Sequence, residues 1–168
     1  MERLNPPRDR PIDPAAFREI VGRFASGITV VATLGDDGQP AGLACQSFAS
    51  LSLDPPLIML CVGKSSTSWP RIEAIGRFAV SILAEEHRDT CAALGRSGPD
   101  KFAAIDWNTS PHGTVHIEGA LAIVDCALEA VHEAGDHLVV TGRVRALAAR
   151  DDGSPLLYFR SAYAAGAF

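Results

Sequence analysis

One lysine and four hydroxyl side chains follow a short apolar segment in the first half of this 168-residue chain. The apolar segment is Leu57–Val62 (LIMLCV), and the polar cluster is Gly63–Ser68 (GKSSTS), directly before Trp69-Pro70. A glycine relaxes the backbone, a lysine supplies charge, and hydroxyl and amide groups at a helix start can converge on an anion. The cluster therefore predicts a phosphate-binding loop. A serine-rich loop that only caps a helix is the alternative, because the GxxxxGK[ST] spacing is incomplete.

The stretch before it, Gly42–Leu51, alternates small and polar side chains. As a strand it would present small or polar residues on at least one face. Such a face lets a flat ring approach the backbone, where amide groups, Gln46 and Ser47 can pair with the polar edge of the ring. Tight sheet packing with a polar outer face explains the same composition, so both interpretations stay open.

Three further groups of residues could carry chemistry. His137 follows Gly135-Asp136, which predicts either a hairpin turn with a histidine at the start of a strand or a functional histidine. Tyr158-Phe159 precedes Arg160 near the end of a predicted strand, where aromatic residues more often pack than bind. His112 and His116 have the HxxxH spacing of a helical metal pair, but Gly113 between them argues against a helix.

The elements that would position these groups are mostly strands. Ile28–Thr33 is rich in β-branched residues, and Leu57–Val62 predicts a strand that is buried on both faces. Val115–Val131 exceeds an ordinary strand, so we expect a bend or hairpin near Glu118-Gly119 or a kink further on. The other predicted strands are Phe78–Leu83, Leu138–Leu147 and Leu156–Arg160. The predicted turns are Gly35–Gly38, Ser52–Pro56, Gly135-Asp136 and Asp151–Ser154.

Helices are predicted at three places. Apolar residues recur at helical spacing between Asp13-Pro14 and Gly27, so an amphipathic helix should cover one side of a sheet. These residues are Phe17, Ile20, Val21 and Phe24. The second helix spans Trp69–Ile75 and ends at Gly76, and the third spans Glu85–Leu94 before a loop at Gly95–Asp100. Long antiparallel strands joined by glycine turns, with a few helices, predict a mainly β fold: a β-barrel with α-helical attachments.

Length and composition indicate one globular domain, residues 13–168, behind a flexible, proline-rich N-terminal arm at residues 1–12. The net charge of −5 argues against a nucleic-acid partner. No apolar run approaches the roughly 20 residues that span a bilayer, so no membrane contact is expected. The four cysteines are widely spaced, without a CxxC pair or an apolar leader, which predicts reduced thiols and a cytoplasmic location.

Six segments follow one another between Phe17 and Tyr163: FASGITVVAT, ACQSFASLSLDPPLIMLCVGKSSTSW, FAVSIL, DKFAAIDW, GDHLVVTGRV and PLLYFRSAY. Together they resemble the short-chain flavin reductases, the NAD(P)H-dependent partners of two-component flavin monooxygenases. The resemblance implies a flavin reductase-like FMN-binding split barrel, usually a homodimer. It also implies that NADH or NADPH transfers a hydride to FMN or FAD, and that the reduced flavin goes to a separate monooxygenase.

The resemblance assigns roles to individual residues. Residues 40–47 would line the flavin ring, and residues 61–67 would follow the ribityl chain and phosphate, with Lys64 supplying charge. The implied flavin-binding residues are Pro40, Ala41, Gly42, Leu43, Ala44, Gln46, Ser47, Cys61, Val62, Gly63, Lys64, Ser65, Ser66 and Thr67. The implied dinucleotide-binding residues are His137, which is also the catalytic candidate, Tyr158, Phe159, Arg160 and Ser161. Lys101-Phe102 and Asp106-Trp107 also match the family. They would form a loop at the pocket mouth, take part in the dimer contact or have a purely structural role.

The chain carries no GxSxG, HExxH or persuasive carboxylate pair. Hydride transfer between two stacked rings needs positioning rather than a protein nucleophile, so this pattern suits a flavin reductase without a metal. Two alternatives stay open. The same fold could retain its flavin and pass electrons to a corrin or a quinone, or it could be a non-catalytic flavin-binding barrel.

Overall fold

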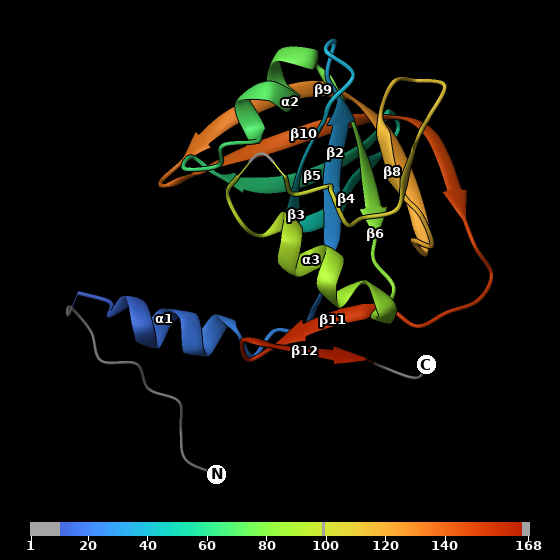
Figure 1. Ribbon diagram of the computed structural model, residues 1–168. Helices are drawn as coiled ribbons and strands as arrows, with labels where there is room; N and C mark the ends of the chain where they lie inside the picture. The colour runs from blue at the N-terminus through green and yellow to red at the C-terminus, as the bar shows by residue number, and fades with distance from the viewer. Residues whose placement is uncertain (1–10, 99, 166–168) are drawn as a thin grey trace.

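A computed structural model describes residues 11–98 and 100–165 of the chain, and its main feature is a seven-stranded antiparallel sheet (Figure 1). The strand order is β3-β2-β6-β9-β10-β5-β4. The bounds are β2 (Thr29–Leu34), β3 (Pro40–Cys45), β4 (Phe48–Leu53), β5 (Pro56–Gly63), β6 (Arg77–Ile82), β9 (Ala122–Ala134) and β10 (His137–Ala149). Hairpins join β2 to β3, β4 to β5 and β9 to β10 at the predicted turns. The predicted N-terminal arm lies, except for residues 11 and 12, outside the described residues.

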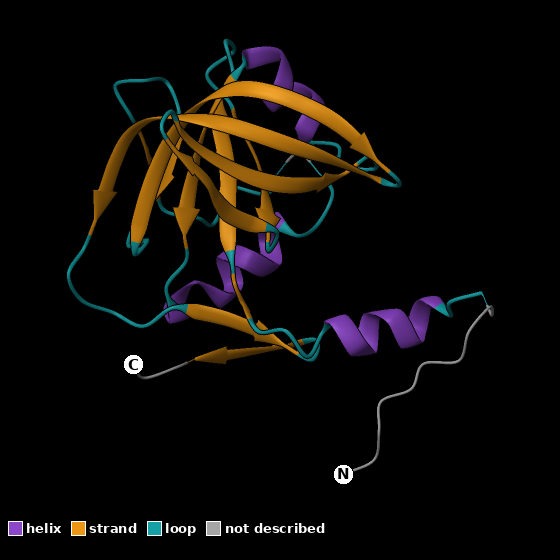
Figure 2. Ribbon diagram, turned by 180° about the vertical axis from the view of Figure 1, so that it is seen from behind, coloured by secondary structure: helices purple, strands orange, loops and turns teal. Residues whose placement is uncertain are grey.

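The two edges of this sheet approach each other. β3 and β4 lie at opposite edges, yet only Gln46 and Ser47 separate them in sequence, so the sheet must curl until its edges are close. At this seam the Cys45 thiol donates a hydrogen bond of 3.5 Å to the carbonyl of Cys61. Within the described residues β3 pairs only with β2, so the barrel stays split. The predicted mainly β fold, a split barrel with helical attachments, is confirmed (Figures 1 and 2).

The interior of the barrel is apolar. β5, β6 and β10 direct Leu60, Phe78 and Val140 into it, and each of these side chains is fully buried. The helix α2 (Trp69–Ile75) adds Trp69 and Ile72 to the same core. Burying side chains of this size stabilises the fold by roughly 1.5–3 kcal/mol each. The packed barrel therefore holds the residues at its seam in place.

A second core lies outside the barrel. The helix α3 (Arg88–Leu94), which follows the short helix η1 (Glu85–His87), and most of the small strands contribute side chains to it. The small strands are β1 (Ser26–Gly27), β7 (Trp107–Thr109), β8 (Val115–Ile117), β11 (Leu156–Phe159) and β12 (Ala162–Ala165). The fully or nearly fully buried members of this core include Ile28, Val30, Leu83, Leu94, Phe102, Val115 and Leu156. This core holds the loop that follows α3 against the barrel.

Two boundaries depend on glycines in the left-handed region. Gly76 ends α2 with φ 71°, and its N–H donates to the carbonyls of Ile72 and Glu73, as the helix prediction required. Gly119, with φ 73°, lies in the break between β8 and β9, so the predicted long strand Val115–Val131 is divided there. The predicted helix over Glu85–Leu94 is present as η1 followed by α3.

The prediction that Leu57–Val62 is buried on both faces is wrong. In β5 the buried residues Ile58, Leu60 and Val62 alternate with half-buried Leu57, Met59 and Cys61. The second face of β5 lies on the outside of the curled sheet, where residues 11–98 and 100–165 cover it only partly. Partial exposure on this face gives Cys61 access to the seam.

The prediction that the first helix covers a sheet is also wrong. Within the described residues, α1 (Pro14–Val21) has no buried residue, and Phe17, Ile20, Val21 and Phe24 are all exposed. Figures 1 and 2 show α1 extending away from the barrel, beyond the sheet of β1, β11 and β12. The apolar stripe is real, but the described part of the chain does not cover it.

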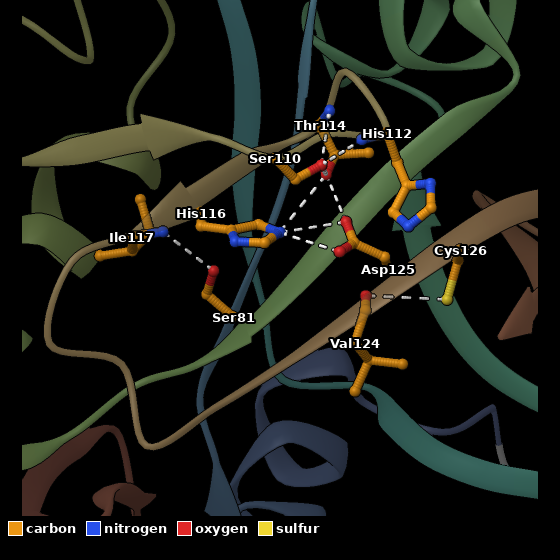
Figure 3. Close-up of polar contacts among 9 residues, drawn as sticks. All are labelled: Ser81, Ser110, His112, Thr114, His116, Ile117, Val124, Asp125 and Cys126. Atoms are coloured by element: carbon orange, nitrogen blue, oxygen red, sulfur yellow. Dashed lines mark hydrogen bonds and ion pairs between the residues drawn. The ribbon is translucent and has the colours of Figure 1, made fainter. Parts of the chain in front are cut away.

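A buried polar network fixes the β7–β8 hairpin to the outer face of the barrel (Figure 3). Asp125 in β9 is only 4% exposed, and its carboxylate accepts from the Thr114 hydroxyl. His116 Nε2 lies 3.0 and 3.1 Å from the two carboxylate oxygens, and Ser110 Oγ shares a bond of 2.7 Å with Thr114 Oγ1. Figure 3 shows His116 turned to Asp125 from β8, so His112 and His116 do not share a helix.

Candidate functional site

A cavity of about 610 Å³ lies where the barrel seam is open. Its floor is formed by the end of β3, the connection to β4 and the end of β5 with the loop that follows it. Its other walls are the end of α3 with the next loop, the start of β10, and β11–β12. We call this cavity the cleft. It exists because the curled sheet leaves its edges unpaired beside Gln46 and Ser47.

Most of the residues predicted to bind flavin line this cleft. They come from two segments that are separate strands of the sheet, β3 with the following connection and β5 with the following loop. The flavin-binding candidates that line it are Leu43, Ala44, Gln46, Ser47, Cys61, Val62, Gly63, Ser65, Ser66 and Thr67. Two dinucleotide candidates, His137 and Tyr158, line it as well. The fold thus brings both groups to one place, and their contacts with a ligand stay a prediction.

The loop Gly63–Ser68 is held in shape by its own backbone. The Lys64 N–H donates to the Asp136 carbonyl at 2.9 Å, and the Ser66 N–H donates to the Gly63 carbonyl at 2.9 Å. Ser66 Oγ accepts from the Trp69 N–H at the start of α2, at 3.2 Å. A loop that is fixed this way presents its hydroxyl groups to the cleft without needing a ligand to order them.

The side chain of Lys64 does not line the cleft. Its Nζ lies 3.2 Å from Glu133 Oε2, and the two side chains are 39% and 83% exposed. An exposed ion pair of this kind contributes little to stability. The structure therefore directs Lys64, which was predicted to supply charge to a phosphate, towards the tip of the β9–β10 hairpin.

His137 stands at the edge of the cleft, on the first residue of β10. Its Nδ1 lies 2.7 Å from Asp136 Oδ1, and half of its side chain is exposed. This hydrogen bond and the nearby imidazole charge lower the pKa of Asp136. Asp136 therefore orients the ring, whose Nε2 is directed towards Gly63 on the neighbouring strand.

Two residues of the opposite wall were not among the predicted site residues. The Tyr163 ring packs edge-on against Tyr158, with centroids 5.6 Å apart, and its hydroxyl donates to Cys91 Sγ at 3.4 Å. That bond and partial burial raise the pKa of Tyr163 to about 12, so the phenol keeps its proton near neutral pH. Tyr163 and Cys91 both line the cleft. The PLLYFRSAY segment contained the signal, since it ends on this tyrosine.

The loop after α3 supplies the cations of the cleft. Arg96, Ser97 and Lys101 line it. Of these, the sequence singled out only Lys101, for a loop at the pocket mouth, a dimer contact or a structural role. Lys101 Nζ donates to Ser68 Oγ at 3.1 Å, and burial lowers its pKa. The same loop is anchored by Phe102, which meets Trp107 edge-on with centroids 6.3 Å apart.

Three flavin candidates lie in a different cavity. Pro40, Ala41 and Gly42 line a space of about 330 Å³, which shares Thr67 and Lys101 with the cleft. A Cβ on Gly42 would lie 2.7 Å from Phe102 Cζ, so the missing side chain admits the phenylalanine ring of the loop. The part of β3 that precedes Leu43 is therefore covered by protein rather than open to the cleft.

The turn between β11 and β12 points away from the cleft. Arg160 and Ser161 have φ of 48° and 61°, and together with α1 they line a cavity of about 430 Å³ that also contacts Arg18 and Arg23. Phe159 is 37% exposed, and the Arg160 guanidinium lies 5.0 Å from the centre of its ring. Within one chain the structure does not bring Phe159, Arg160 or Ser161 to the cleft.

A flavin fits what the cleft offers. Small side chains at Ala44 and Ser47 leave backbone accessible to a flat ring, and Gln46 is exposed to pair with its polar edge. The hydroxyls of the fixed loop and the ammonium of Lys101 lie at one end, where an anionic tail would sit. Within the described part of the chain, no cluster of three histidine, cysteine or acidic residues could hold a metal, and no helix is long and apolar enough to cross a membrane.

Comparison of the sequence with known proteins assigns the chain to one family. Residues 21–167 match the family described as flavin reductase like domain. The chain is 51% identical over 152 residues to the reductase subunit HsaB of a flavin-dependent monooxygenase from Rhodococcus jostii, covering 90% of this chain and 77% of that protein.

Solved structures agree with this assignment. Nitrilotriacetate monooxygenase component B from Mycobacterium thermoresistibile superposes with a TM-score of 0.87 at 46% identity, over 91% of this chain and 86% of that one. The Streptomyces globisporus NADH:FAD oxidoreductase SgcE6, in complex with NAD and FAD fragments, superposes with a TM-score of 0.87 at 31% identity. The match covers 95% of this chain and 98% of that one. The resemblance seen in the sequence is confirmed, and the chain belongs to the flavin reductase family.

Proposed function

We propose that this flavin reductase takes a hydride from NADH or NADPH, transfers it to FMN or FAD in the cleft, and releases the reduced flavin to a separate monooxygenase. The relatives support this reading, since HsaB is named as the reductase subunit of a flavin-dependent monooxygenase. SgcE6, which has the same fold, is named as an NADH:FAD oxidoreductase, and its solved structure is in complex with NAD and FAD fragments.

The observation that carries the proposal is the composition of the cleft. Its floor collects the small and hydroxyl-bearing residues of β3, β5 and the Gly63–Ser68 loop, and its edge holds His137. Bound flavin and nicotinamide supply the hydride acceptor and donor themselves, so the protein has to bind and align two rings. In this proposal the floor binds the flavin, and His137, oriented by Asp136, positions the dinucleotide on the open side.

An exposed floor favours turnover of flavin over retention. Gln46 and Ser47 are exposed, and the cleft is open along the seam. A flavin bound in this cleft would keep one side accessible to solvent, so the reduced flavin could dissociate as a product. The alternative of a retained flavin that reduces a corrin or quinone would require the cleft to be closed by something outside the described residues.

Steady-state oxidation of NADH and NADPH, with FMN, FAD and riboflavin in turn, tests the proposal. We expect the rate to rise with added flavin and saturate, because flavin is a substrate. Flavin that remains bound through gel filtration, with a rate that ignores added flavin, would favour the retained-cofactor alternative. Anaerobic mixing with NADH or NADPH that fails to bleach the flavin absorbance would favour a non-catalytic flavin-binding barrel.

A homodimer is also part of the proposal, and α1 supports it. An isolated helix shorter than about 12–15 residues is marginal in water, so the eight residues of α1 need packing partners. The exposed apolar residues in α1 and just after it, with Phe24 at 82% exposure, make a face that a second copy could cover. Light scattering on the protein should give twice the chain mass, and Phe17→Glu combined with Ile20→Glu should shift it to the monomer. A dimer that survives this double change would place the interface elsewhere.

The cytoplasmic location remains a proposal that rests on cysteine chemistry. Cys45, Cys61, Cys91 and Cys126 are all free thiols. Thiols persist in reducing compartments, where NADH and NADPH are also available. A free-thiol count on protein isolated from its source cells would test it, and oxidised cysteines would contradict it.

A further inference from the structure

Two lysines lie near the loop that is expected to hold the flavin phosphate, and the structure distinguishes them. We propose that Lys101, and not Lys64, is the cation that neutralises the flavin phosphate. This inference rests on the proposed function and adds to it a residue that decides how the protein distinguishes phosphorylated flavins from riboflavin.

Lys64 is a poor candidate in spite of its place in the sequence. It is adjacent to the hydroxyl cluster, but its side chain does not line the cleft. Its ammonium group is already paired with Glu133 at 3.2 Å, on the exposed side of the hairpin between β9 and β10. Turning this side chain towards the cleft would separate the ammonium group from Glu133, whereas the ammonium group of Lys101 already lies at the cleft.

Lys101 has the opposite arrangement. Its side chain is half-buried and lines both the cleft and the neighbouring 330 Å³ cavity, with Thr67 as the other residue common to the two. Its Nζ donates to Ser68 Oγ at 3.1 Å, which places the ammonium beside the hydroxyl cluster. Within residues 11–98 and 100–165 no carboxylate forms an ion pair with it.

Partial burial of the Lys101 ammonium without a counter-ion costs free energy, which indicates that an anion is its missing partner. Burial lowers the pKa of Lys101, which means that the surroundings disfavour its charged form. A phosphate dianion between Lys101 and the hydroxyls of Ser65 and Thr67 would supply the opposite charge and accept several hydrogen bonds at once. The structure holds the other half of that arrangement ready, since the hydroxyl loop is fixed by backbone bonds.

Affinity for FMN and for riboflavin, which share the ring and differ by the phosphate, separates the two lysines. Dissociation constants are measured by flavin fluorescence titration for the wild type, Lys101→Met, Lys101→Arg and the matched control Lys64→Met. Methionine keeps the length of the apolar stem and removes the charge. Loss of a charge-assisted contact predicts that Lys101→Met weakens FMN roughly tenfold to a hundredfold, while riboflavin stays within about twofold of wild type.

The remaining variants and the salt dependence test whether the charge of Lys101 is responsible. Lys101→Arg should recover most of the FMN affinity, and Lys64→Met should bind both flavins as the wild type does. Rising salt should weaken FMN in the wild type and have little effect in Lys101→Met. The inference is overturned if Lys64→Met shows the FMN-selective loss, or if Lys101→Met weakens FMN and riboflavin equally or not at all. A wild type that binds neither flavin would instead refute the proposed function, and circular dichroism confirms that each variant is folded.

Discussion

Two polar clusters in this molecule have similar residues and opposite surroundings. At Asp125, a carboxylate, a histidine and two hydroxyls bond to one another beneath the β7–β8 hairpin, and the carboxylate is almost completely buried. At the cleft, His137 is half exposed, and the hydroxyls of Ser65 and Thr67 face a cavity of about 610 Å³. The first cluster is satisfied by the chain itself, and the second has capacity for a ligand.

The difference separates structure from function better than residue type does. A histidine near an aspartate occurs in both clusters, as His116–Asp125 and as His137–Asp136. Buried polar groups must be paired, so the Asp125 network reports on folding. Groups left half-paired at the rim of a cavity do not stabilise the fold, so they are available for binding. Variants in the two clusters should therefore change different measurements.

The largest effect is expected from Asp125→Ala. It leaves the Thr114 hydroxyl and the His116 ring without their acceptor in a buried place, which should lower the free energy of unfolding by about 3 kcal/mol. Urea denaturation measures it. Asp125→Asn is the matched control, because the amide oxygen can still accept one bond, and its loss should be smaller. Equal stability of Asp125→Ala and wild type would show that the network is not structural.

His137→Ala should change catalysis and leave folding intact. Because the ring is half exposed at the cleft edge and its hydrogen bond is to the neighbouring Asp136, its removal should raise the apparent KM for NADH by roughly tenfold, or about 1.4 kcal/mol, and leave flavin affinity nearly unchanged. Steady-state kinetics and flavin titration give the two numbers. Asp136→Asn keeps a hydrogen-bond partner for the ring, so its KM for NADH should lie between the values for wild type and His137→Ala. Unchanged NADH kinetics would remove His137 from the site.

The smallest effect concerns pH. Burial, with the nearby Asp125 charge, raises the pKa of the Cys126 thiol from 9.0 to about 12. The folded state keeps the proton that the unfolded state releases, so this contribution to stability is fully present below about pH 9 and is lost as pH rises towards 12. Between about pH 9 and pH 10, Cys126→Ala should therefore lose about 1 kcal/mol less stability than wild type. Parallel pH profiles from denaturation of the two proteins would contradict this.

Local features of the sequence were sufficient for most of the fold. Strands such as Ile28–Thr33, the helix that ends at Gly76, and the turns at Gly35–Gly38 and Gly135-Asp136 depend on neighbours in the chain, so propensity and turn chemistry predict them. The exposure of α1 could not be predicted in this way. An apolar stripe predicts that a helix packs against something, but it does not say whether the partner is in the same chain.

The candidate site shows the same division. Residues 43–47 and 61–67 belong to one continuous stretch, so its small and hydroxyl-bearing residues predicted most of the cleft floor. Cys91, Arg96, Lys101 and Tyr163 come from other parts of the chain, and they reach the cleft only because α3, its following loop and β12 pack against the barrel. Lys64 and Lys101 are equally basic in the sequence. Which of them faces the cleft depends on the direction of each side chain.

By itself the sequence determined the family, the mainly β fold and the chemistry of the floor, because these follow from residues that are close together in the chain. Only the tertiary structure decided which of Lys64 and Lys101 faces the cleft, that Arg160 lies beside α1 and that the described residues leave the apolar face of α1 uncovered. The physical reason is that strand register and long-range packing set side-chain direction, and neither is encoded by neighbouring residues alone.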